Sequence, residues 1–145
     1  MTIRALQKED LSPSLQQQAS ALFGQLNSQL DPFPLASLLE ADNPPVVLAC
    51  LEGGALLGMA CMANYRVLSG HKGWIEDLVV DQKHRGRGIG RELVSSLLAI
   101  GREQGLSEIL LFTGEHRIPA IALYESLGFH RKNSRLYSLK LAAGE

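Results

Sequence analysis

The segment from Trp74 to Gln104 constrains the fold more than any other part of the chain. The hydrophobic run Ile75–Val80 is typical of a strand, although Glu76 and Asp77 interrupt it. A loop with three glycines at alternate positions follows, and then apolar residues recur at helical spacing until Gly105, a natural helix end. A strand, a glycine-rich turn and a helix in this order predict a sheet with a helix packed against it.

The remaining sequence supplies further strands and helices on both sides of this segment. Two apolar runs flank Gly53-Gly54, a pair that suits a tight hairpin turn. Proline is tolerated in a first helical turn, so Ser12-Pro13 and Pro119 indicate helix starts. We expect strands at 2–6, 46–51, 55–65, 74–80 and 107–113, helices at 12–26, 35–40, 89–104 and 119–127, and one or two closing strands within 129–141.

This order predicts one domain, residues 1–145, of the mixed α/β (α+β) class. Its central mixed sheet would have six to seven strands, with helices on both faces.

Charge and cysteine content exclude several functional classes. With 14 basic and 15 acidic side chains the net charge is -1, so we expect no general attraction to nucleic acid or to a membrane surface. The apolar runs are far shorter than the roughly 20 residues that span a bilayer, and the start of the chain has no signal-peptide pattern. Cys50, Cys61 and the four histidines match no metal-ligand spacing. We therefore expect reduced cysteines, no metal and a cytoplasmic location.

The glycine-rich loop has the composition of an anion site. Backbone N–H groups at a helix start lack partners, and the helix dipole adds positive charge there. Glycines allow the main chain to approach an anion closely, and guanidinium groups pair with phosphate oxygens. The loop residues are Arg85, Gly86, Arg87, Gly88, Ile89 and Gly90. A phosphate-loop nucleotidase is disfavoured because no Gly-Lys-Ser/Thr ending is present, and Arg91 stands where a dinucleotide fingerprint needs its third glycine.

Residue by residue, this loop resembles the Arg/Gln-x-x-Gly-x-Gly/Ala loop of the GNAT superfamily of N-acetyltransferases. The segments Ile75–Val80 and Ala120–Phe129 are similar to the same family, at its usual separations, so the resemblance covers roughly the second half of the chain. Ile75–Val80 is also similar to the segment in glucosamine-6-phosphate N-acetyltransferases and in many small bacterial relatives. The resemblance implies the acyl-CoA N-acyltransferase fold. It also implies direct transfer of an acetyl group from acetyl-CoA to a primary amine in a ternary complex.

The resemblance also implies roles for individual residues in coenzyme binding. The loop would hold the coenzyme A pyrophosphate, and the pantetheine arm would run beside Leu78, Val79 and Val80. Tyr124 would contact the coenzyme and protonate the departing thiolate. Arg117 stands where many relatives have an asparagine, and it could reach a phosphate instead.

The acidic pair is the candidate for handling the amine. An amine of pKa ~10.4 is only about one part in 2,500 unprotonated at pH 7, so a general base or a water chain to one would help. The resemblance favours Glu76 as this base and leaves Asp77 to bind the acceptor ammonium or hold the neighbouring loop; the two roles could be exchanged. Alternation along a strand predicts that the two side chains point to opposite faces.

Several alternatives stay open. A non-catalytic acyl-CoA-binding or sensor module would have the same fold and the same loop. The acceptor could be a polyamine, an amino acid or a lysine side chain. A sugar phosphate would need a second cationic pocket, for which the candidates are Arg66, His71, Lys72, Arg117 and Arg135. The closing strands, 131–141, could pair with a second copy, and we expect a homodimer.

Overall fold

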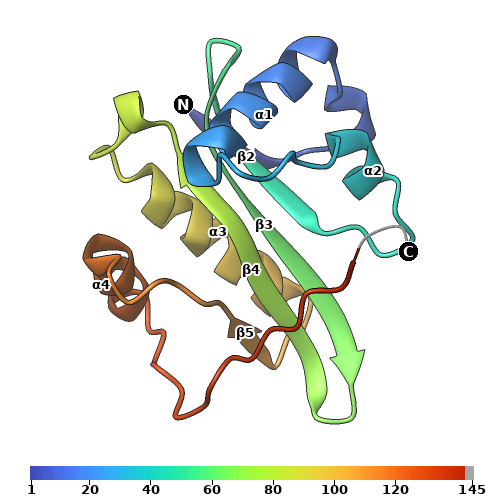
Figure 1. The fold of residues 1–145 in the computed structure, drawn as a ribbon. Helices are drawn as coiled ribbons and strands as arrows, with labels where there is room; N and C mark the ends of the chain where they lie inside the picture. Colours follow the sequence, from blue (N-terminus) through green and yellow to red (C-terminus); the bar gives the residue numbers. More distant parts are fainter. Residues whose placement is uncertain (143–145) are drawn as a thin grey trace. The chain divides into compact units, whose positions relative to one another are not determined.

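The computed structural model describes residues 1–142, which form two compact units. The first unit, Met1–Phe112, contains the sheet and three helices, and the second begins at Thr113 and contains one further helix (Figure 1).

The first unit is built on a mixed sheet whose five strands follow the order of the sequence. Antiparallel pairs join β1 (Thr2–Ala5), β2 (Val46–Glu52), β3 (Ala55–Val67) and β4 (Gly70–Val80), and β5 (Glu108–Leu110) pairs parallel to β4. The predicted hairpin between β2 and β3 is confirmed, because Gly53 and Gly54 adopt φ values of 57° and 82°.

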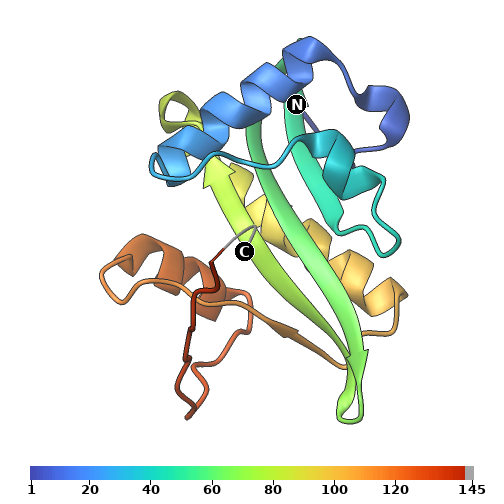
Figure 2. The ribbon, with the colours of Figure 1, turned by 45° about the vertical axis from the view of Figure 1, so that its right-hand side comes forward.

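Helices cover both faces of this sheet, as predicted (Figure 2). On one face lie α1 (Pro13–Leu26) and α2 (Leu35–Leu39); on the other lies α3 (Ile89–Glu103). The start of α1 is fixed by Ser12, whose Oγ accepts a hydrogen bond from the Leu15 N–H at 3.0 Å. No helix within residues 1–142 has the length and hydropathy that crossing a bilayer requires.

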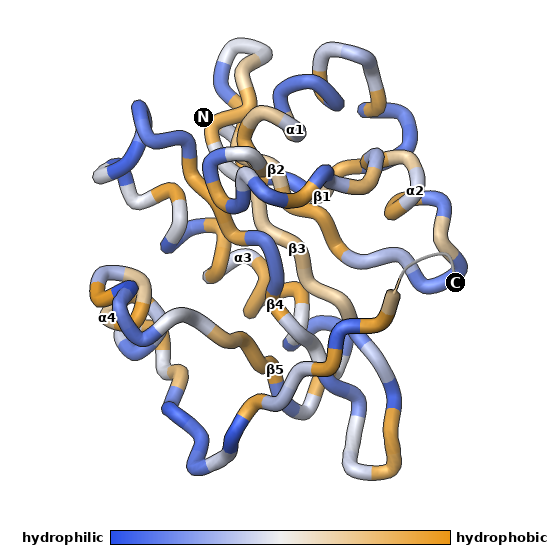
Figure 3. Tube along the Cα trace, in the orientation of Figure 1, coloured by the Kyte–Doolittle hydropathy of each residue, from blue (hydrophilic) through white to orange (hydrophobic). Residues whose placement is uncertain are grey.

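The core consists of two apolar layers, one on each side of the sheet. On the α1 side, the buried residues are Leu6, Leu15, Ala19, Leu22, Leu35, Val47, Ala49, Leu56, Met59 and Val79. On the other side of the sheet they include four residues of α3: Ile89, Leu93, Val94 and Leu97. Each buried aliphatic side chain of this size contributes roughly 1.5–3 kcal/mol. Figure 3 shows that a hydrophilic stretch interrupts the hydrophobic trace of β4, and this stretch contains the acidic pair.

The predicted sheet of six to seven strands is wrong in its strand number. β5 covers only Glu108–Leu110 instead of 107–113, and no strand forms within the described part of 129–141. The segment Arg131–Arg135 is wholly polar, so it lacks the apolar alternation that fixes the register of a strand. The apolar side chains that follow it, Leu136, Tyr137, Leu139 and Leu141, are 62% to 85% exposed.

The second unit contains α4 (Ile118–Ser126), with Pro119 in its first turn as predicted. Tyr124 is its buried residue, while the other members of the predicted stripe, Ile121, Leu123 and Leu127, are partly exposed.

Candidate active site

A bulge in β4 places the acidic pair. Cys61 pairs with Glu76 and Met59 pairs with Val79, so β4 has two residues where β3 has one between these pairs. Asp77, the first extra residue, has φ 55°, in the left-handed region that non-glycine residues rarely adopt. Such a bulge disrupts the ladder locally, bends the strand and redirects side chains.

Both acids lie where protein atoms remove part of their hydration. Their side chains reach solvent, yet burial raises the pKa of the Asp77 carboxyl. Burial and then the nearby Asp77 charge raise the pKa of the Glu76 carboxyl. A carboxylate with a raised pKa is a stronger base than an exposed one, which suits removal of a proton from an ammonium group.

The bulge also removes the basis for placing the two acids on opposite faces. Strict alternation does not hold through a residue with φ 55°. Burial, and after it the nearby Asp77 and Glu76 charges, together raise the pKa of the Cys61 thiol to about 12. Both acids therefore lie near Cys61, which pairs with Glu76 across the ladder and packs against the apolar layer on the α1 side of the sheet.

Beyond the short β5, one edge of β4 is open. β5 pairs with β4 only at Lys72, Gly73 and Trp74, while β4 continues to Val80. Within residues 1–142, no strand pairs with this edge at Leu78, Val79 and Val80. An extended ligand with amide groups can bind such an edge as an added strand.

The predicted anion loop, Arg85–Gly90, leads directly into α3, and we call it the glycine loop. Gly86 and Gly88 have φ values of 81° and 78°, and a Cβ at either would meet no atom within 4 Å. Backbone conformation, not crowding, therefore requires glycine at these two positions. Gly88 is the N-cap of α3, and no side chain in the described part of the chain caps this helix. The exposed loop thus presents helix N–H groups that can donate hydrogen bonds to an anion.

The two arginines of the glycine loop are held by protein groups. Arg85 Nε donates to the Val80 carbonyl at 3.3 Å. The Arg87 guanidinium donates to both carboxylate oxygens of Glu52, at 3.2 and 3.4 Å, and this pairing lowers the pKa of Glu52. Exposed ion pairs contribute little to stability, so a phosphate can displace Glu52 from Arg87.

Tyr124 is held in its protonated form. Its ring packs edge-on against Phe129, with 5.9 Å between the ring centroids. Burial raises the pKa of the Tyr124 hydroxyl, and the positive charge of Arg117, at the N-cap of α4, partly opposes this effect. The phenol therefore remains protonated at neutral pH.

The cationic candidates are divided between the two units of the chain. Arg66 and His71 lie on the β3–β4 hairpin, and Lys72 is ion-paired with Glu108 at 3.8 Å. In the second unit, Arg135 lines a pocket of about 460 Å³ formed by Arg131–Arg135.

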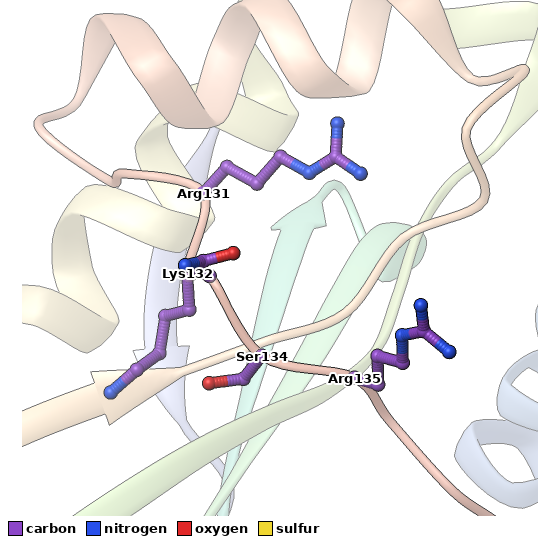
Figure 4. A pocket seen from close by; sticks show the side chains of 5 residues that line it. Arg131, Lys132, Ser134 and Arg135 are labelled. Atoms are coloured by element: carbon purple, nitrogen blue, oxygen red, sulfur yellow. The ribbon is translucent and has the colours of Figure 1, made fainter.

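Figure 4 shows the Arg131 and Arg135 side chains extending in one direction and Lys132 in another. Arg131 also lies 3.5 Å from the Glu115 carboxylate. Arg131 and Lys132 were not predicted as lining residues, although they belong to a run of polar and cationic residues.

Gln25 of α1 was not predicted either; its side chain binds the turn before the glycine loop. No local pattern marks it, because its partner lies 56 residues away in the chain. As for metals, no group of three His, Cys, Asp or Glu side chains within residues 1–142 could hold an ion.

Curated relatives match part of this chain. It is 42% identical to human N-acetyltransferase 8 over 60 residues, which are 41% of this chain and 26% of that protein. It is 41% identical to the glucosamine 6-phosphate N-acetyltransferase of Trypanosoma brucei brucei over 66 residues, 44% of this chain and 43% of that protein. The chain thus spans less than half of the length of these relatives.

Structural similarity covers nearly the whole chain. A crystal structure of a Trypanosoma brucei acetyltransferase superimposes with a TM-score of 0.77 at 28% identity, covering 97% of this chain and 99% of that one. This match confirms the predicted fold. The model of the acetyltransferase (GNAT) family matches residues 4–129. This chain therefore belongs to the GNAT acetyltransferase family.

Proposed function

We propose that this chain is an N-acetyltransferase that moves the acetyl group of acetyl-CoA directly onto a primary amine in a ternary complex. One observation carries the proposal: a single strand–loop–helix segment holds a partly desolvated acid pair on a bulge and an uncapped, exposed helix start behind two left-handed glycines. The first can accept a proton and the second can hold a diphosphate.

The glycine loop would bind the coenzyme A pyrophosphate through the first N–H groups of α3, with Arg85 and Arg87 as charged partners. Ile89, 1% exposed, anchors the end of this loop as the first, buried residue of α3. The open edge of β4 at Leu78–Val80 would pair with the amides of the pantetheine arm. An N–H donated to the thioester oxygen would stabilise the negative charge that develops there.

Glu76 would accept the proton of the acceptor ammonium, directly or through water, and Asp77 would bind that ammonium or hold the bulge. Because the charges of both acids influence the same neighbouring thiol, the exchanged assignment is tested beside the first. Kinetic measurements on variants therefore decide which of the two acids accepts the proton. The matched substitutions Glu76→Gln and Asp77→Asn each remove one carboxylate and keep its approximate size.

Tyr124 would donate its proton to the thiolate that leaves, and Arg117 would contact a phosphate. The buried phenol is protonated at neutral pH, as a proton donor must be. Tyr124→Phe removes the hydroxyl and keeps the ring against Phe129, so it should lower kcat with little loss of stability.

For the acceptor, we propose a cationic amine that the acidic pair attracts. The human relative is named only as an N-acetyltransferase, and the trypanosomal relative acts, by its name, on glucosamine 6-phosphate. A sugar phosphate is therefore one acceptor to test, beside polyamines, amino acids and lysine peptides.

The test is release of free thiol from acetyl-CoA in the presence of each amine. We expect at least one amine to be acetylated, with Glu76→Gln and Tyr124→Phe lowering turnover while leaving coenzyme affinity intact. Tight binding of acetyl-CoA without turnover on any amine would favour the non-catalytic binding module. Normal turnover by both variants would overturn the assigned roles.

We further propose that the protein acts as a homodimer in the cytoplasm. The exposed apolar side chains of Leu136, Tyr137, Leu139 and Leu141 are available to pair with a second copy. Cys50 and Cys61 are free thiols, as expected in a reducing compartment. Light scattering after size exclusion tests the dimer, and fractionation of cells that produce the protein tests the location.

A further inference from the structure

Two glutamines of α1 use their side-chain amides to hold turns of the sheet. At Gln18, Nε2 donates to the Gly54 carbonyl at 3.2 Å, and Oε1 accepts from the Leu56 N–H at 2.9 Å. This amide clamps the turn between β2 and β3. Gln25 lies two helical turns further along α1, so its side chain projects from the same side of the helix.

Gln25 binds the turn that precedes the glycine loop. Its Nε2 donates to Asp81 Oδ1 at 3.2 Å, and its Oε1 accepts from the Gln82 N–H at 3.0 Å. Asp81 in turn accepts from the Lys83 N–H at 3.3 Å and contacts His84 Nδ1 at 3.0 Å. The oxygen and the nitrogen of the Gln25 amide therefore both bind groups at the start of the short helix η2 (Gln82–His84), where Asp81 also binds Lys83 and His84.

The two ends of the glycine loop are held very differently. At its end, Ile89, the first residue of α3, is buried and forms a strong apolar anchor. At its beginning, Gln82, Lys83 and Arg85 are exposed, so polar contacts alone fix the chain there. Gly86 and Gly88 increase the backbone freedom between these ends. The Asp81 N–H also donates to the Leu57 carbonyl at 2.8 Å, and the contact from α1 adds a second restraint on this turn. Without that second restraint, part of the loop would have to be ordered when the ligand binds, which lowers affinity.

We propose that Gln25 is a positioning residue for the coenzyme: through Asp81 and Gln82 it holds the glycine loop in the conformation that receives the diphosphate. This inference rests on the proposed function. It assigns to the end of α1 a part in coenzyme affinity, although Gln25 does not belong to the loop. The hydrogen bond from Gln25 is also the largest of the effects that lower the pKa of Asp81, in keeping with an ionised partner.

The test compares Gln25→Ala with Gln18→Ala, a matched control on the same helix with the same number of lost side-chain contacts to a turn. The dissociation constant for coenzyme A is measured by calorimetry, and Tm is measured without ligand. We expect Gln25→Ala to raise the Kd roughly tenfold, as two ordinary hydrogen bonds would. In kinetics, the KM for acetyl-CoA should rise while kcat at saturation is kept. Gln18→Ala should lower Tm by a similar amount and leave the Kd unchanged.

A second pair of variants, Gln25→Glu and Gln18→Glu, adds a pH readout. At pH 8 a carboxylate at position 25 would face the Asp81 carboxylate and could not donate to it. At lower pH the two carboxyl groups can share a proton, which restores the hydrogen bond. The ratio of the Gln25→Glu Kd to the wild-type Kd should therefore fall as the pH is lowered from about 8 to about 5. The same ratio for Gln18→Glu should stay flat, since Gln18 contacts only neutral groups.

The outcomes separate the inference from the function on which it rests. A wild-type chain that binds no coenzyme A overturns the proposed function, and the inference falls with it. Wild-type binding together with equal Kd values for Gln25→Ala and Gln18→Ala overturns the inference alone. A flat pH ratio for Gln25→Glu also contradicts it, because the carboxylate pair would then have no influence on the loop.

Discussion

The acidic bulge of β4 and the glycine loop lie in one segment but are built in opposite ways. At the bulge, a non-glycine residue, Asp77, adopts a strained left-handed conformation, and burial raises the pKa values of both acids. In the glycine loop, glycines occupy the left-handed positions without strain, and the backbone is exposed. The difference indicates separate roles: the bulge raises the pKa of a proton acceptor, and the loop provides backbone N–H donors for an anion.

The largest expected effect is at the bulge. Glu76→Gln should lower kcat by about 10²–10⁴, the usual contribution of a general base, with the KM for acetyl-CoA unchanged. Steady-state thiol release with both substrates varied measures the two constants. Asp77→Asn is the matched variant: if it has the larger effect, the two acids exchange roles. If the KM for acetyl-CoA rises with either variant, the division between bulge and loop is wrong.

The raised pKa values predict the pH dependence. The base must be ionised to accept a proton, and burial moves its pKa above the ordinary value of 4.5 for a glutamate. Turnover should therefore fall tenfold per pH unit below a midpoint higher than that value. Rates are measured with an acceptor amine of low pKa, so that protonation of the amine does not hide this fall in turnover, the acidic limb of the pH profile. Glu76→Gln should remove this limb; an identical limb in the variant would exclude Glu76 as the base.

In the loop, the expected effect is smaller and falls on binding. Gly88→Ala places a side chain at φ 78°, a strain of roughly 1–2 kcal/mol. The loop can relieve this strain by leaving its anion-binding conformation. The KM for acetyl-CoA should rise about tenfold, since 1.4 kcal/mol is a factor of ten, with little change in kcat.

Gly105→Ala is the control for this strain, because Gly105 has φ 73° and open space around it at the other end of α3. Calorimetric titration of coenzyme A into both variants checks the prediction. Equal loss of affinity in the two would show that the effect is on stability and not on the loop.

The smallest expected effect comes from the ion pair between Arg87 and Glu52. Glu52→Gln removes the charge that competes with a phosphate for the guanidinium, so the KM for acetyl-CoA should fall by a few-fold at low salt. Arg87→Gln should raise it by a similar factor. Measurements at two salt concentrations provide the check, because both changes should shrink as salt increases. Changes of the same sign in the two variants would mean that Arg87 does not contact the coenzyme.

Local signals in the sequence predicted much of the fold. Ser12-Pro13 specifies a capped helix start, and Gly53-Gly54 specifies a hairpin, because each acts within a few residues. The length of β5 and the missing closing strands were mispredicted, since strand pairing depends on partners far away in the chain. Phe129–Leu141 contains β-forming residues, but nothing in the segment itself indicates whether an edge is available to it.

The candidate site shows the same limit. Glu76, Asp77 and the glycine loop are neighbours in sequence, so their proximity was predictable. The bulge at Asp77 was not, because it arises from a register shift between β3 and β4 that alternation alone does not reveal. Gln25 was missed for the same reason, since its contacts depend on how α1 packs on the sheet.

The most direct test of the central claim is a crystal structure of the protein with acetyl-CoA bound. We expect the diphosphate against the backbone N–H groups of Gly86 to Gly90, and the thioester beside the open edge of β4, within reach of one of the two acids. A coenzyme bound elsewhere, with the glycine loop empty, would contradict it.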